Sequence, residues 1–187
     1  MGTTLDFVAL ADLVRGITLE VVGNDAALGS GVSWPPGHVV TNAHVVRRAR
    51  VAVRSVDGRQ LSARLLVRDA EADLALLRLE GADLPAATLG DVSRIRIGSL
   101  VVAVGHPLGV RGALSAGIVH AIAPIARGGA PWIHADVRLA PGNSGGPLAD
   151  VSGAIVGVNA MVAGGLALAV PIARVIDFAR AAGVAVP

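Results

Sequence analysis

The chain has 187 residues, 53% of them hydrophobic, and a formal net charge of +2. This composition excludes a disordered chain and supplies enough apolar side chains for a sizeable core. It contains no cysteine, which excludes disulfides and thiolate metal sites, and its five histidines lack zinc-like spacing. No metal or cofactor is therefore predicted.

The basic residues do not predict a nucleic-acid partner, although the sequence pI is near 10.8. All 16 of them are arginines, so a small positive charge persists to high pH. The tight cluster Arg47, Arg48 and Arg50 has no interleaved aromatic side chains. Such a cluster is typical of a solvated strand end rather than a nucleic-acid groove.

The first half of the chain predicts a short helix followed by strands. Phe7, Leu10 and Val14 recur at helical spacing, which predicts a helix over residues 5–15. Short runs rich in Val and Ile, separated by turn residues such as Asp57 and Gly58, predict strands over 17–22, 29–34, 38–42, 49–55, 60–69, 74–79 and 95–105. Residues 107–112 contain proline and glycines, and a boundary between two half-domains is predicted there.

The second half continues the pattern, with strands predicted over 113–121, 132–137, 146–149, 153–159 and 166–171, and a helix over 172–182. Many short strands between turns favour an all-β sandwich or barrel. Residues 151–173 are uncharged and long enough to span a bilayer. Asn159 and the Gly164, Gly165 pair interrupt them, so two strands are predicted instead of a membrane segment. Residues 1–16 lack the basic start of a secretory signal.

Residues 142–147, Gly-Asn-Ser-Gly-Gly-Pro, place one hydroxyl between glycines and bar a helix immediately afterwards. This pattern indicates a nucleophile in an oxyanion-binding turn, but a serine hydroxyl alone is a poor nucleophile. His44 stands where a predicted strand ends, and Asp73 stands where a very apolar strand begins. Taken alone, Asp73 is equally typical of an exposed turn. Together, the order His, Asp, Ser is that of one of the convergent catalytic triads.

The segments around these three residues resemble the chymotrypsin-fold serine proteases, specifically the HtrA (Deg) branch. The resemblance extends to residues 101–109 (VVAVGHPLG), to Ser115 and residues 117–119, and to residues 168–175 (LAVPIARV), so it spans about residues 17–180. It implies an all-β fold of two six-stranded antiparallel β-barrels with short N-terminal and C-terminal helices. The expected single protease domain has an N-terminal barrel over about 17–106, a C-terminal barrel over about 113–171 and a helix over about 172–182, with no PDZ domain.

The resemblance also implies a serine endopeptidase that cleaves unfolded or extended polypeptides through an acyl-enzyme. Ser144 would be the nucleophile, His44 the general base, and Asp73 the group that fixes the imidazole tautomer. Gly142, Asn143 and Ser144 would form the oxyanion hole. The digestive and clotting proteases of this fold have Asp where Asn143 stands. Activation by N-terminal clipping is therefore not expected, and loop rearrangement would govern the oxyanion turn.

Eight further residues are predicted to bind substrate: Arg138, Leu139, Val158, Asn159, Ala160, Met161, Ala167 and Leu168. Most of them suggest a pocket for a small aliphatic side chain. Residues 159–161 could pair with an extended substrate by strand addition. Arg138 has three interpretations: a side chain turned to solvent, an acid-recognising pocket, or an ion pair with Asp136.

Two rival functions share the same residues. The pattern around Ser144 also satisfies the G-x-S-x-G elbow of α/β-hydrolases, but there the acid and His follow the Ser and a helix follows the elbow, whereas here Pro147 follows. The stronger rival is a non-catalytic or chaperone-like peptide-binding homologue. The family resemblance further suggests an extracytoplasmic location, in the periplasm or cell envelope, and a homotrimer formed through the apolar face Phe7, Leu10, Val14.

Overall fold

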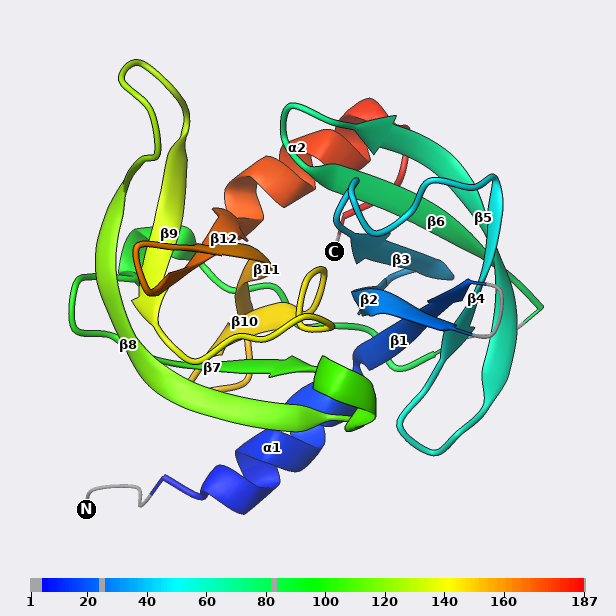
Figure 1. Cartoon of the computed structure of the whole chain (residues 1–187), viewed down its shortest axis with the longest axis horizontal. Coiled ribbons are helices and arrows are strands. Elements are labelled where there is room, and N and C mark those ends of the chain that lie inside the picture. Colours follow the sequence, from blue (N-terminus) through cyan, green and yellow to red (C-terminus); the bar gives the residue numbers. More distant parts are fainter. Residues whose placement is uncertain (1–4, 24–25, 82–83, 187) are drawn as a thin grey trace.

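The computed structural model describes residues 5–23, 26–81 and 84–186. Two closed antiparallel barrels lie beside one another, each with six strands (Figure 1). The first has the order β1-β2-β3-β6-β5-β4. Its strands are β1 (Thr18–Gly23), β2 (Ala26–Trp34), β3 (His38–Thr41), β4 (Arg50–Arg54), β5 (Gln60–Asp69) and β6 (Leu74–Glu80).

The second barrel has the order β10-β11-β12-β9-β8-β7. Its strands are β7 (Leu100–Gly105), β8 (Ala113–Pro124), β9 (Pro131–Asp136), β10 (Pro147–Asp150), β11 (Ile155–Ala163) and β12 (Leu166–Pro171). The all-β class with two six-stranded barrels is thus confirmed. Two α-helices, α1 (Phe7–Gly16) and α2 (Ile172–Ala181), and short 3₁₀ turns at Val92–Arg94 and Pro107–Gly109 complete the described elements.

The boundary between the barrels differs from the prediction at 107–112. Strand β7 pairs with β8 and β10, so it belongs to the second barrel and not to the first. The proline and glycines of residues 107–112 form the connection between β7 and β8, which is a loop inside one barrel. The division between the barrels therefore falls in the segment that joins β6 to β7, after Glu80 and before Leu100.

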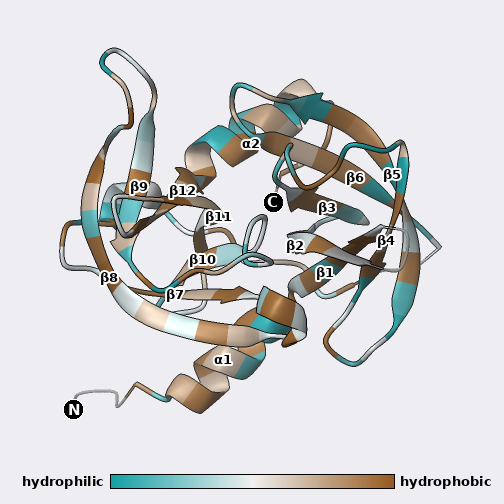
Figure 2. Cartoon of the chain, in the orientation of Figure 1, coloured by the Kyte–Doolittle hydropathy of each residue, from teal (hydrophilic) through white to brown (hydrophobic). Residues whose placement is uncertain are grey.

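Alternating burial is clear along the outer strands β5 and β8, because successive side chains point to opposite faces of a sheet. Brown and teal residues alternate along β5 and β8, which lie on the outside of the molecule (Figure 2). One apolar cluster packs inside each barrel, and a third joins the two barrels and both helices. This third cluster includes Val40 and Leu76 from the first barrel and Val104 and Val158 from the second. It fixes the two barrels relative to each other.

Helix α1 begins after Asp6, whose side chain accepts hydrogen bonds from the N–H groups of Val8 and Ala9. Leu10 and Val14 are buried in the cluster that joins the barrels, while Phe7 is exposed. The face Phe7, Leu10, Val14 therefore does not stand open for a trimer contact, because two of its three side chains already contact this chain's own core.

Residues 151–173 form β11, β12 and the start of α2, as the two-strand interpretation predicts. The hairpin turns at Gly164 and Gly165, whose φ values of +58° and +83° suit glycine. Within the part of the chain that the structure describes, no helix has the length and apolar character needed to cross a membrane.

Candidate active site

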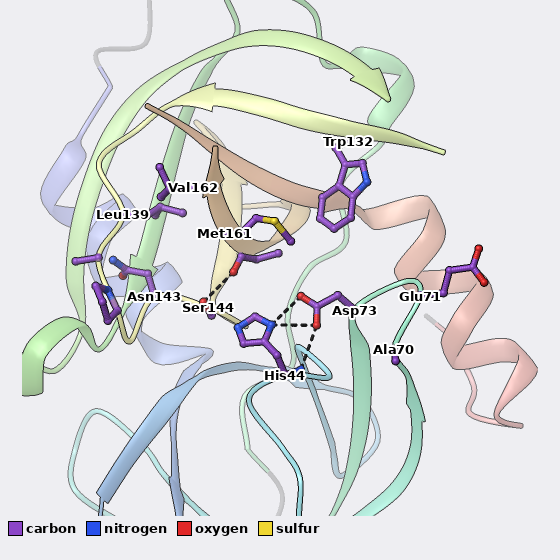
Figure 3. A pocket seen from close by; sticks show the side chains of 13 residues that line it. His44, Ala70, Glu71, Asp73, Trp132, Leu139, Asn143, Ser144, Met161 and Val162 are labelled. Carbon is purple, nitrogen blue, oxygen red and sulfur yellow. Dashed lines mark hydrogen bonds and ion pairs between the residues drawn. The ribbon is translucent and has the colours of Figure 1, made fainter. Parts of the chain in front are cut away.

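His44 and Asp73 form a hydrogen-bonded pair at the edge of the first barrel. Strands β3 and β6 pair antiparallel, with Thr41 opposite Ala75, so the turn after β3 lies beside the residue that precedes β6. His44 Nδ1 lies 2.8 Å from Asp73 Oδ2 and 3.0 Å from Oδ1 (Figure 3). The backbone N–H of His44 also donates to Oδ1, at 3.1 Å. The Asp73 carboxylate thus contacts both the imidazole ring and the backbone of His44.

The backbone of Asp73 adopts a left-handed conformation, with φ +52°. Non-glycine residues adopt this region rarely, and they are enriched there at functional sites. The side-chain amide of Asn42 donates to the Asp73 carbonyl at 2.9 Å and holds this conformation. The Asp73 carboxylate can only accept a hydrogen bond, so its partner atom Nδ1 must carry the proton of the neutral His44 imidazole. Nε2 is then left as a proton acceptor.

Ser144 lies between β9 and β10, where the turn presses against the first barrel. The Ser30 N–H donates to the Ser144 carbonyl at 2.7 Å, and a Cβ on Gly145 would collide with the Ser30 carbonyl. The Ser144 hydroxyl donates to the carbonyl of Ala160 in β11, at 2.8 Å, and not to His44.

The residues before Ser144 form a type II turn. The N–H of Asn143 donates to the Ala140 carbonyl at 3.0 Å, with Pro141 and Gly142 in the central positions and Gly142 at φ +107°. Leu108 N–H donates to the Pro141 carbonyl at 3.2 Å. The C=O and N–H of a trans peptide point in opposite directions. The Gly142 N–H therefore points away from Leu108.

Comparison with known proteins identifies the family of the chain. The family model described as "Trypsin-like peptidase domain" matches residues 29–158. The chain belongs to the trypsin-like peptidases. Within them it is an HtrA-type serine protease domain, as the resemblance found in the sequence implies. The order His44, Asp73, Ser144 in this chain therefore occurs in a member of a protease family.

The curated relatives are much longer than this protease domain. It is 38% identical over 164 residues to a "Probable periplasmic serine endoprotease DegP-like" of Pseudomonas savastanoi pv. phaseolicola, covering 82% of this chain and 34% of the relative. A protein of the same name from Hahella chejuensis is 41% identical over 138 residues, covering 72% of this chain and 29% of the relative. The chain thus spans about a third of the length of these relatives.

Solved structures agree on the fold. The structure "HtrA-type protease AlgW with decapeptide" matches with a TM-score of 0.84 and 26% identity over 95% of this chain and 67% of that chain. The structure "HtrA-type protease AlgW with tripeptide" matches with a TM-score of 0.85 and 29% identity over 94% of this chain and 63% of that chain. The chymotrypsin-like fold is therefore confirmed.

A cleft of about 880 Å³ lies between the barrels of the protease domain. Its walls contain His44, Asp73, Asn143 and Ser144, together with Leu139, Ala160 and Met161 of the predicted substrate-binding residues. Figure 3 shows the imidazole at one side of this space and the side chains of Leu139, Met161, Val162 and Trp132 around it. The volume is within the usual range of about 300–1,000 Å³ for ligand pockets.

The other predicted substrate-binding residues lie elsewhere. Val158, Asn159, Ala167 and Leu168 are buried in the second barrel, and the Asn159 amide donates to the Pro147 carbonyl at 2.7 Å. None of these four lines the cleft. Arg138 is exposed, and among the described residues it makes no ion pair with Asp136. Of its three interpretations, the side chain turned to solvent agrees with the structure.

Six cleft residues were not among the predicted substrate-binding or oxyanion residues: Ala70, Glu71, Trp132, Ala140, Pro141 and Val162. Trp132 is held by Arg174 of α2, whose guanidinium lies 5.5 Å from the ring centre. Trp132 and Trp34 are the two tryptophans of this sequence. Because the sequence has so few large aromatic side chains, the presence of Trp132 could have indicated a residue that lines the cleft.

His106 lies behind the oxyanion turn and is almost fully buried. Its backbone N–H donates to Ser30 Oγ at 3.1 Å, and Ser30 Oγ in turn donates to the Gly142 carbonyl at 2.7 Å. His106 Nδ1 also lies 3.1 Å from Ser30 Oγ. Burial, with a smaller contribution from the Arg111 guanidinium, lowers the pKa of His106 from the ordinary 6.5 to about 4. The imidazole is therefore neutral at pH 7.

We expect acid to destabilise this protease domain through His106. The unfolded chain takes up a proton at His106 as pH falls through 6.5, while the folded chain resists until about pH 4. Stability that is present above pH 6.5 is thus lost progressively down to about pH 4, by up to about 3 kcal/mol. Urea unfolding at several pH values, compared between wild type and His106→Asn, measures this.

The unfolding free energy of the wild type minus that of His106→Asn is expected to fall as pH falls, because only the wild type carries the buried imidazole. His120→Asn is the matched control, since His120 is exposed. Its curve is expected to run parallel to that of the wild type. Parallel curves for His106→Asn and wild type between pH 7 and 4 would show that His106 does not resist protonation.

Proposed function

We propose that this chain is a serine endopeptidase that cleaves extended polypeptide segments through an acyl-enzyme. The observation that carries the proposal is the Asp73–His44 pair facing Ser144 across one cleft. Asp73 fixes the imidazole with Nε2 as acceptor, so His44 can take the Ser144 proton as Oγ attacks the peptide carbonyl. His44 then returns that proton to the leaving amine, and water repeats the sequence to release the acyl group.

The hydrogen bond from Ser144 to Ala160 supports a role for substrate in aligning the nucleophile. Ala160 lies where the register between β11 and β12 shifts, and it has no partner residue on β12. An extended substrate along β11 can donate a backbone N–H to the Ala160 carbonyl. The Ser144 hydroxyl, displaced from that carbonyl, then turns to His44. Catalytic hydrogen bonds often form only in the substrate complex.

The oxyanion donors in this proposal are the backbone N–H groups of Gly142 and Ser144. The Gly142 N–H points away from Leu108, and the proposal directs it toward the cleft that Ser144 lines. The Asn143 N–H already donates to Ala140 within the turn, so Asn143 contributes its place in the turn and not a donor. Each donor in such a site is worth about 3–4 kcal/mol of transition-state stabilisation.

The walls of the cleft favour an apolar aliphatic side chain before the scissile bond. Leu139, Ala160, Met161 and Val162 present carbon atoms and one thioether, and Trp132 closes the far end. Burial of such a side chain contributes about 1.5–3 kcal/mol relative to leaving it exposed. Only an extended chain reaches both β11 and Ser144, so we propose unfolded or flexible segments as substrates.

The relatives carry names that suggest where such a protein works. Both DegP-like relatives are named periplasmic. We propose an extracytoplasmic location for this protease on that basis. The homotrimer stays a prediction from the family resemblance. Leu10 and Val14, two residues of the face predicted to form it, are buried within this chain.

A fluorophosphonate probe tests the proposed activity. We expect covalent labelling of the wild type at Ser144 and no labelling of Ser144→Ala, because attack on phosphorus needs an activated hydroxyl. We also expect a reduced, unfolded protein to be cleaved mainly after aliphatic residues while its native form stays intact. A folded protein that binds such peptides but takes up no probe would instead be a peptide-binding homologue.

A further inference from the structure

A second hollow, of about 380 Å³, shares His44 with the cleft. We call it the arginine hollow. It is formed by the first barrel and is lined by Gly23, Leu28, His44, Val45, Arg47, Arg48 and Val51. Two of these residues are cationic, and none of these lining residues, all in the described part of the chain, is Asp or Glu. The hollow therefore combines an apolar floor with positive charge.

The arginine hollow and the cleft adjoin different strands that contact Ser144. The Ser144 hydroxyl donates a hydrogen bond to the Ala160 carbonyl of β11. The Ser144 carbonyl accepts a hydrogen bond from the Ser30 N–H of β2. The cleft lies on the β11 side. Leu28, two residues before Ser30 on β2, lies in the arginine hollow. His44 is the residue that the two spaces share.

In this arrangement the cleft and the arginine hollow would contact different parts of a bound substrate. The cleft beside Ser144 holds the residue whose carbonyl is attacked, so it takes the segment before the scissile bond. His44 delivers a proton to the leaving amine, so the segment after the scissile bond departs past the imidazole. A strand advances about 3.3 Å per residue, and the next few residues of that segment would therefore lie over the arginine hollow.

We propose that the arginine hollow binds the segment after the scissile bond and selects acidic side chains there, chiefly through Arg47. The proposal rests on the proposed protease function and adds a substrate preference to it. Arg47 is exposed and lies in the segment between β3 and β4. A guanidinium presents a planar fork of N–H donors that matches the geometry of a carboxylate.

Arg47 is expected to contribute more than Arg48. Arg48 also lines a neighbouring hollow together with Arg50 and Glu80, whereas Arg47 lines only the arginine hollow of these two. Both side chains are solvent-exposed, which limits the gain to that of a surface ion pair. The preference is therefore expected to be modest and to weaken with salt.

Peptide pairs that differ only between Asp and Asn test the subsite. Each pair carries the same apolar residue before the scissile bond, with Asp or Asn at one of the first three positions after it. In about 50 mM salt we expect kcat/KM for the wild type to favour Asp by about three- to fivefold at one or more of these positions. In Arg47→Gln the ratio is expected to fall to near one.

Arg50→Gln is the matched control. It removes the same charge from the same arginine cluster, but Arg50 does not line the arginine hollow. We expect its Asp-to-Asn ratio to equal that of the wild type. A wild-type ratio near one at all three positions would overturn the subsite, and so would a ratio that Arg50→Gln lowers as much as Arg47→Gln does. In either case cleavage of the Asn peptides leaves the protease function standing.

Binding to Ser144→Ala separates the two proposals. Fluorescence anisotropy with the same labelled peptides reads the subsite without hydrolysis, and tighter binding of Asp peptides that is lost in Ser144→Ala/Arg47→Gln supports it. If the wild type hydrolyses no peptide while this difference persists, the protease function fails and the subsite stands. Equal binding of Asp and Asn peptides to Ser144→Ala would count against the subsite alone.

Discussion

Ser144→Ala and His44→Ala are each expected to lower kcat for peptide hydrolysis by about 10⁵- to 10⁶-fold. The first removes the proposed nucleophile, and the second removes the proposed base that takes its proton. Since either loss stops the same step, the double variant is expected to be no slower than either single variant. The residual rate then reports what the oxyanion turn and substrate binding achieve on their own.

Asp73→Asn is expected to cost less, about 10⁴-fold. Asn can keep the shape of the site, but its amide can donate a hydrogen bond to Nδ1. The imidazole would then carry its proton on Nε2, which faces the nucleophile, and could not act as the base. The position of Asp73 makes this test sharp, because its carboxylate contacts both the ring and the backbone N–H of His44.

Glu71→Gln is the matched control for Asp73→Asn. Glu71 also lines the cleft, but Figure 3 shows its carboxylate directed away from His44. We expect its kcat/KM to stay within about fivefold of the wild type, as for an exposed charge. Quenched-fluorescence peptides measure all of these rates, and circular dichroism verifies folding. Hydrolysis by folded Ser144→Ala at the wild-type rate would remove the basis of the proposed function.

Strand positions could be predicted from local patterns, because turns and alternation are written into neighbouring residues. Strands β5 and β12 have the boundaries predicted for them, and each begins shortly after a clear turn. Strand β7 is shorter than the predicted 95–105, since residues 95–99 form a turn before it. The barrel boundary depends on which strands pair across long distances, and a loop rich in proline and glycine looks the same inside a barrel and between two barrels.

Three candidate residues that line one cleft could be selected from the sequence, but their surroundings could not. His44, Asp73 and Ser144 are separated by strands whose order the family resemblance supplies. Val158 and Asn159 are buried, whereas Ala160 and Met161 line the cleft, and the pairing of β11 with β12 is irregular between Asn159 and Met161. No sequence pattern specifies that irregularity, or the hydrogen bond from Ser144 to the Ala160 carbonyl. Both depend on packing between the barrels.

Gly142→Ala is expected to lower kcat by about 10²- to 10³-fold, with a smaller change in KM. A Cβ at Gly142 would collide with the His106 carbonyl and lie 2.9 Å from the Pro107 Cα. Both are backbone atoms, so no side-chain rotation can remove the clash. The φ of +107° also disfavours any L side chain. The peptide between Pro141 and Gly142 must therefore rotate, which takes the Gly142 N–H away from the oxyanion.

Gly98→Ala separates this effect from ordinary glycine strain. Gly98 has a φ of +88°, but a Cβ there would meet no atom within 4 Å. Its cost is expected to be about 1–2 kcal/mol in unfolding free energy, with kcat unchanged. Gly142→Ala is instead expected to lose fluorophosphonate labelling rate in parallel with kcat, because both reactions develop negative charge on an oxygen at the turn. If Gly142→Ala folds and keeps the wild-type kcat, the oxyanion is held by other donors and the assignment of the Gly142 N–H is wrong.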